Sequence, residues 1–153
     1  MKYLFVGLMR WLSRMPLKGI RVLGHGLGLL LWAFLSNRRH IVQTNLTLCF
    51  AEKSNREIEQ LTRAHFVQFA QSLLDRSWLW HAPLQLLESR LKWVGTAAAI
   101  SQLDADGPKI ILAPHFVGLD AGGMALTLRA NKPVAFIFVP QHNKVMDEWV
   151  TEG

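Results

Sequence analysis

The chain has 153 residues, which favours one domain, or one domain with an appendage. Half of the residues are apolar and 18% are charged, so disorder is excluded as the main state of the chain. The single cysteine, Cys49, excludes a disulfide framework within the chain and any metal site made from several cysteines.

The positive charge is concentrated at the N-terminus. The net charge is +6, but no acidic residue occurs before Glu52, and acids slightly outnumber bases from there on. The basic residues of the N-terminal part are Lys2, Arg10, Arg14, Lys18, Arg21, Arg38 and Arg39. Because these bases alternate with strongly apolar runs, the pattern indicates that this segment binds a membrane surface or, as the second choice, a nucleic acid.

Residues 1–36 are predicted to form a membrane anchor or an interfacial helix. The longer apolar stretch, 22–35, is interrupted only by His25 and is shorter than the roughly 20 residues of a straight crossing. A buried core helix of a soluble protein is the alternative. Gly24 and Gly28 have the spacing that lets two helices pack closely.

The middle of the chain is predicted to be helical. Residues 38–50 have helical spacing, and Ser54 with Glu57 forms a capping box that predicts a helix running to about Trp80. The apolar stripe of that helix is Ile58, Leu61, Phe66, Phe69, Leu73, Leu74 and Trp78. Further helices are expected at 84–91, 96–103 and 117–129.

The predicted fold class is α/β. A helical N-terminal region is followed by the start of a mainly parallel sheet. Residues 109–113 and 134–139 are short apolar runs bounded by turn residues, which is typical of buried strands, and 91–94 could add a short strand. Strand, helix and strand at this spacing favour a right-handed parallel crossover.

His115 and Asp120 form an H-x4-D motif where the first predicted strand gives way to a helix. A carboxylate that accepts a hydrogen bond from one imidazole nitrogen fixes the tautomer and lets the other nitrogen act as a general base. His142 and Asp147 have the same spacing, so spacing alone is weak evidence. The context after a buried strand, beside small residues, favours His115, whereas a capping or packing histidine is the structural alternative.

The chain resembles a known family over nearly its whole length. The motif PHFVGLDAGG is preceded by RRHIVQTNLTLCFAEKS and followed by FVPQHNKVMDEWV. Together these segments resemble the late acyltransferases of bacterial lipid A biosynthesis (lauroyl and myristoyl acyltransferases), within the wider lysophospholipid acyltransferase group. The resemblance implies transfer of a fatty acyl chain from acyl carrier protein to a hydroxyl of a lipid A precursor at the cytoplasmic face of the inner membrane.

The resemblance also assigns residues. It implies that His115 is the general base and that Asp120 orients it, with Gly118, Gln141 and Asn143 as substrate-binding residues. No cofactor is expected, and because the histidine spacings match no ligand motif, no metal is expected either.

Family members are considerably longer than this chain. Residues 37–153 are therefore expected to be the N-terminal part of the acyltransferase domain, and the 153-residue chain alone is expected to be inactive. Three other functions stay open: a non-catalytic membrane-associated protein, an acyltransferase for a different lysolipid, and a nucleic-acid binder using Arg38 and Arg39. No recognition motif supports the last of these.

Overall fold

The computed structural model describes residues 2–130, 133–137, 139, 142 and 147, and all regular secondary structure among them is helical. The helices are α1 (Lys2–Ser13), α2 (Leu17–Phe34), α3 (Ser36–Cys49), α4 (Asn55–His81), α5 (Leu84–Arg90), α6 (Ala97–Asp104) and α7 (Leu119–Arg129). The helices expected from the sequence are therefore present, with ends shifted by a few residues.

The predicted α/β fold is wrong for the described part of the chain. Residues 109–113 and 91–94 form no strand, and neither do the described residues of 134–139. A strand needs a neighbour to take up its backbone hydrogen bonds, and these segments do not pair with one another. Their apolar side chains are exposed instead: Ile110 is 101%, Leu112 93% and Ile137 104% exposed. The H-x4-D motif consequently lies at a coil-to-helix turn, and the residues that the structure describes form no parallel crossover.

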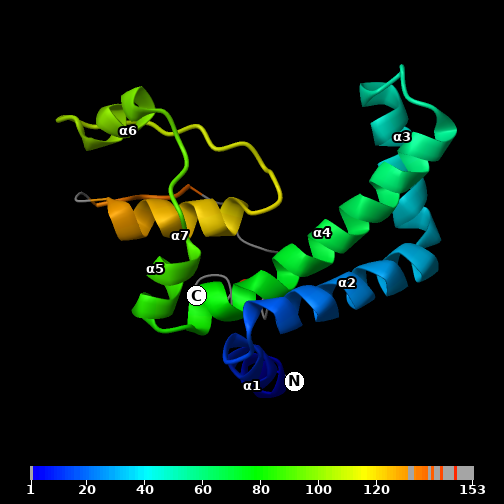
Figure 1. The fold of residues 1–153 in the computed structure, drawn as a ribbon, viewed down its shortest axis with the longest axis horizontal. Helices are drawn as coiled ribbons and strands as arrows, with labels where there is room; N and C mark the ends of the chain where they lie inside the picture. Colours follow the sequence, from blue (N-terminus) through cyan, green and yellow to red (C-terminus); the bar gives the residue numbers. More distant parts are fainter. Residues whose placement is uncertain (1, 131–132, 138, 140–141, 143–146, 148–153) are drawn as a thin grey trace.

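Helix α4 is the central element of the molecule. It begins with the predicted capping box: the Ser54 hydroxyl accepts from the backbone N–H of Glu57, and the Glu57 carboxylate accepts from the backbone N–H of Ser54 at 2.9 Å. Helix α2 lies antiparallel beside α4, α1 crosses below the C-terminal end of α4, and α3 folds back at its N-terminal end (Figure 1).

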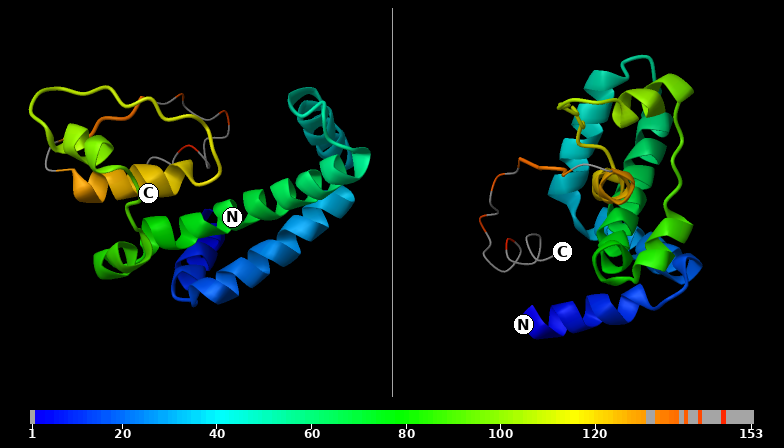
Figure 2. Two further views of the ribbon diagram at one scale, coloured as in Figure 1. Left: turned by 45° about the horizontal axis from the view of Figure 1, so that its top comes forward. Right: turned by 90° about the vertical axis from the view of Figure 1, so that its left-hand side faces the viewer.

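The core lies where α2, α4 and α5 meet. Its buried members are Ile20, Trp78, Leu79 and Leu87, and a second small cluster from α1 contains Met9 and Leu12. Helix α7 packs against the first cluster through partly buried Ala121, Met124 and Leu128, and lies beside the C-terminal half of α4 (Figure 2). This packing fixes the position of the helix that carries the acid of the H-x4-D motif.

Candidate active site

The loop that precedes α7 folds into two consecutive tight turns around the motif. The backbone N–H of Phe116 donates to the carbonyl of Pro114 at 2.8 Å, so the chain turns at His115. The N–H of Leu119 then donates to the carbonyl of Phe116 at 3.1 Å. Gly118 occupies the third position of this second turn with φ 93° and ψ 8°, a left-handed conformation that a residue without a Cβ adopts at low cost.

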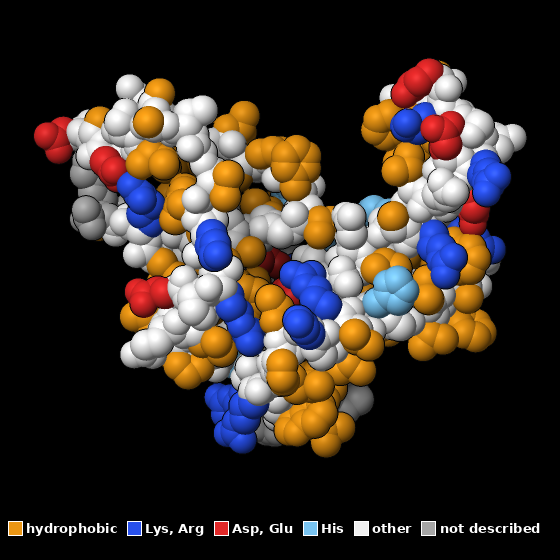
Figure 3. Space-filling model, in the orientation of Figure 1, with side chains coloured by type: hydrophobic (Ala, Val, Ile, Leu, Met, Phe, Trp, Pro, Cys, Tyr) orange, Lys and Arg blue, Asp and Glu red, His pale blue; other side chains and the backbone are white. Residues whose placement is uncertain are grey.

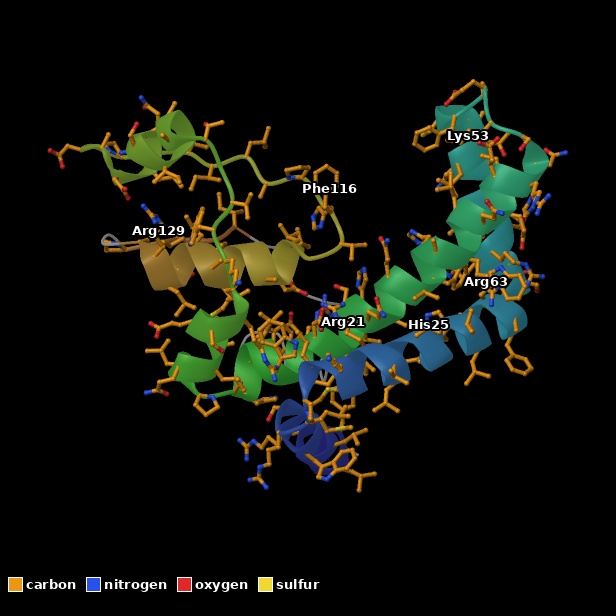
Figure 4. All side chains as sticks on the ribbon, viewed as in Figure 1. Arg21, His25, Lys53, Arg63, Phe116 and Arg129 are labelled. Atoms are coloured by element: carbon orange, nitrogen blue, oxygen red, sulfur yellow. The ribbon has the colours of Figure 1, made fainter. Side chains whose placement is uncertain are left out.

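His115 is exposed on this loop. Its neighbour Phe116 is 75% exposed and lies at the edge of the lobe formed by α6, α7 and the loop, on the side that faces α3 and α4 (Figure 4). Figure 3 shows an open notch between this lobe and α3. The His115 side chain is therefore accessible from solvent in the described part of the chain.

Asp120 lies in the first turn of α7 and is held by an arginine from α4. The Arg76 Nε–H donates to Asp120 Oδ2 at 2.7 Å, and each side chain is 29% exposed. The Arg76 guanidinium also lies 5.5 Å from the centre of the Trp80 ring, which limits where it can move.

The structure places His115 on the loop and Asp120 in the first turn of α7, and it does not join their side chains. No hydrogen bond or ion pair between these two side chains occurs in the described part of the chain, and Asp120 pairs with Arg76 instead. This pairing engages Oδ2 and leaves the second carboxylate oxygen for another donor. The motif therefore supplies an exposed imidazole on the loop and, five residues later, a carboxylate anchored by Arg76.

Sequence reasoning missed Arg76, because no local pattern connects it to Asp120 and the burial that calls for a partner is visible only in the structure. Arg76 belongs to a stretch of α4, residues 71–80, in which no residue is fully exposed, so its charge requires a partner. The neighbouring Asp75 is also partly buried and also has partners. Its carboxylate accepts a hydrogen bond from Trp78 Nε1–H at 3.0 Å and forms an ion pair with Arg21 at 2.9 Å. Burial raises the pKa of Asp75 above 3.8, although the Trp78 hydrogen bond and the Arg21 charge act against this shift.

The structure describes only some of the other predicted site residues. Gly118 is the N-cap residue of α7 and belongs to the second turn. Gln141 and Asn143 lie outside the described residues. His142 is exposed and Asp147 is partly buried. Across the ranges that the structure describes, no three side chains of His, Cys, Asp or Glu come together in a way that could hold a metal ion.

Comparison with known proteins supports the resemblance. A family model described as bacterial lipid A biosynthesis acyltransferase matches residues 1–153. The lipid A biosynthesis lauroyltransferase of Escherichia coli strain K12 is 27% identical over 99% of this chain and 49% of its own length. The palmitoleoyltransferase of the same strain is 28% identical over 92% of this chain and 45% of its length, as is a lipid A biosynthesis acyltransferase of Shigella flexneri.

The chain thus spans about half the length of these curated relatives. No solved structure is significantly similar to it. The family match covers every residue, including the H-x4-D turn and the N-terminal helices, and it confirms the resemblance inferred from the motifs. The chain belongs to the bacterial lipid A biosynthesis acyltransferase family.

Proposed function

We propose that the protein carrying this chain transfers a fatty acyl group from acyl carrier protein to a hydroxyl of a lipid A precursor, with His115 as the general base. The observation that carries the proposal is the H-x4-D turn at the start of α7, in a chain that belongs to this family. His115 is exposed to an incoming hydroxyl, and Asp120 is anchored one turn later.

The proposed chemistry needs a base and a group that stabilises its protonated form. The acceptor hydroxyl oxygen attacks the thioester carbonyl, His115 removes the hydroxyl proton, and the thiolate of the carrier leaves and takes up a proton. Asp120 stabilises the imidazolium through its free oxygen when the His115 ring turns towards it. Catalytic hydrogen bonds often shorten only once substrate is bound, so the unpaired imidazole is compatible with this role.

The proposed partners fit the charge and the apolar surface of the N-terminal part. Acyl carrier protein and lipid A precursors are both anionic, and Arg10, Arg14 and Lys18 are exposed beside the apolar α1 and α2. We therefore place the protein at the cytoplasmic face of the bacterial inner membrane, where the acyl carrier is available.

The test is an acyl-transfer assay on membranes that contain the full protein. Labelled acyl carrier protein and a lipid A precursor are supplied, and transfer of label to the lipid is measured in the wild type, in His115→Ala and in His142→Ala. Transfer that depends on His115 but not on His142 supports the proposal. Equal transfer by the wild type and His115→Ala would contradict the assigned base, and no transfer by the wild type would contradict the activity.

A further inference from the structure

The loop that carries His115 is anchored to the helices where α7 begins. Residues 105–118 are all exposed, and Leu119 and Asp120 are the first residues after them that are partly buried. Among the residues that the structure describes, the bond between Arg76 and Asp120 is the only hydrogen bond or ion pair that joins α7 to α4. The position of the Asp120 carboxylate therefore depends on Arg76.

Arg76 is itself restrained by a second contact. Its guanidinium lies 5.5 Å from the centre of the Trp80 ring, one helical turn further along α4. Trp80 is partly buried and packs against both core clusters, so its ring has little freedom to move. Because Arg76 and Asp120 are each 29% exposed, their pair is better shielded from water than a pair on an open surface. Arg76 therefore transmits the position of the core to the start of α7.

The other charged side chains on α7 and on the helices around it have different neighbours. Arg129 pairs with Asp104 and lines a small pocket with Glu88, while Asp75 pairs with Arg21 and is also under the charge of Arg90. Within the described ranges, Arg76 is therefore the charged side chain in direct contact with Asp120. Removal of its charge would change the surroundings of this carboxylate without breaking another ion pair.

The charge of Arg76 matters because a general base must be unprotonated before the substrate arrives. A carboxylate beside an imidazole favours the imidazolium, which helps once the proton has been taken but inactivates the base beforehand. A cation paired with that carboxylate offsets part of this effect. Since Arg76 engages only Oδ2 of Asp120, it can hold the carboxylate and moderate its charge while Oδ1 stays available.

We propose that Arg76 is a positioning residue for the acyl transfer proposed above, and that it acts through Asp120. It fixes the carboxylate for contact with the His115 imidazolium, and its charge helps to keep the imidazole unprotonated near neutral pH. The inference rests on the proposed function, because it takes His115 as the base. In this role Arg76 contacts neither the substrate nor the reacting atoms.

The first experiment measures kcat and kcat/KM of the full protein in detergent between about pH 5.5 and 9, with Arg76→Gln and Arg76→Lys. Gln keeps hydrogen-bond donors but no charge, so the acid limb of kcat/KM should move to higher pH by about 0.5–1 unit, a modest shift because the pair is partly exposed. The kcat plateau at high pH should fall about tenfold, because the carboxylate is held less firmly. Lys keeps the charge but not the planar guanidinium, so it should keep the wild-type limb and lower the plateau.

The matched control is Arg63→Gln. Arg63 is also on α4, with its guanidinium 5.8 Å from the centre of the Trp32 ring, but it lies near the α3 end of the molecule, away from α7 (Figure 4). This variant should keep both the limb and the plateau, and thermal unfolding at each pH ensures that only folded protein is compared. A wild-type limb in Arg76→Gln would overturn the charge effect, and a wild-type plateau would overturn the positioning. Equal changes in Arg63→Gln would overturn the assignment to Arg76.

The second experiment repeats Arg76→Gln in an Asp120→Asn background. If Arg76 acts through Asp120, its substitution should change kcat there by less than about twofold and leave the acid limb in place. The same fall as in the wild-type background would show another route of action and overturn the proposal. Transfer that depends on His115 but not on Arg76 would overturn this inference alone. A wild type without transfer, or one indifferent to His115→Ala, would overturn the proposed function and this inference with it.

Discussion

At the scale of single residues, His115 and Asp120 differ in how firmly they are held. The imidazole is exposed on a loop, whereas the carboxylate is fixed by Arg76 from a distant part of the sequence. Substitution of His115 should therefore change activity with little effect on stability, while substitution of Asp120 also removes a contact between α4 and α7.

The first prediction concerns His115→Ala. Loss of a general base lowers kcat by about 10²–10⁴-fold, and the fold should be unaffected because the side chain is exposed. The measurement is kcat in the full protein together with the midpoint of thermal unfolding. His142→Ala, also at an exposed position, is the control and should retain most activity.

The second prediction concerns the charge of Asp120. Asp120→Asn keeps the shape but removes the charge that stabilises the imidazolium and pairs with Arg76, so most activity should be lost. Asp120→Glu should retain part of it, because the carboxylate is preserved. Arg76→Gln separates the two roles of Asp120: it leaves the carboxylate charge in place and should loosen α7. An Asp120→Asn protein with wild-type kcat would refute the assigned role.

The third prediction is a pH dependence of stability that arises from His81. Burial, and secondarily the positive charge of Arg10, hold the pKa of His81 below 6.5. As pH falls through 6.5, the unfolded chain therefore binds a proton before the folded chain does, and stability is lost towards acid. Thermal unfolding in detergent at pH 7.5 and 5.5 measures the effect.

The matched variants for this test are two His→Gln substitutions. His81→Gln should reduce the loss of stability between the two pH values, whereas His40→Gln, at an exposed position on α3, should leave it unchanged. If His81→Gln kept the full acid-dependent loss, another group would have to be responsible.

At the scale of elements, the start of α4 is the clearest link between sequence and structure. The fourth prediction is that Ser54→Ala destabilises the protein by about 1 kcal/mol, because the first turn of α4 loses the hydroxyl that caps the Glu57 N–H. Ser54→Asp, which preserves a capping oxygen, should restore most of the stability. Denaturant unfolding of both variants provides the measurement.

The helices were predictable because their signals are local. The Ser54–Glu57 box and the pair Gly24 and Gly28 appear in the structure as expected. The predicted apolar stripe of α4 is confirmed only in part, because two of its members, Leu61 and Phe69, are exposed. The strands were not predictable, because a short apolar run such as 109–113 indicates a tendency to be buried but does not supply a partner for its backbone. For the described residues the run is an exposed coil.

The candidate site was predictable only in part, because the sequence shows local patterns but not contacts between distant segments. H-x4-D is a local pattern, and the turn it predicts is present, with Gly118 in the left-handed conformation. The partner of Asp120 lies 44 residues earlier in the chain, and no spacing rule connects Arg76 to it. Only the packing of α7 on α4 brings the two charges together.

At the scale of the whole molecule, the N-terminal helices present exposed apolar side chains, such as Leu4 and Phe34, and also cover α4. The fifth prediction is that removal of residues 1–36 produces aggregates rather than a soluble protein. The deletion removes Ile20 from the core and Gly28 from its close contact with Val67. The apolar surface of α4 that these residues cover then becomes exposed. Membrane fractionation followed by light scattering of the extract is the measurement. A monodisperse soluble product would show that α4 does not need this cover.

The chain order of α2 and α4 has a consequence for biosynthesis. Gln71, which contacts Gly24, is made 37 residues after Phe34, the last residue of α2. At about 5–20 residues per second, α2 is complete roughly 2–7 seconds before its partner exists. Because the chain emerges from the ribosome in the same order, α2 is outside without cover, flanked by cations, for an interval of similar length before Gln71 emerges. For the membrane attachment proposed above, this interval is the time in which the ribosome would be delivered to the membrane, before α4 can fold onto α2.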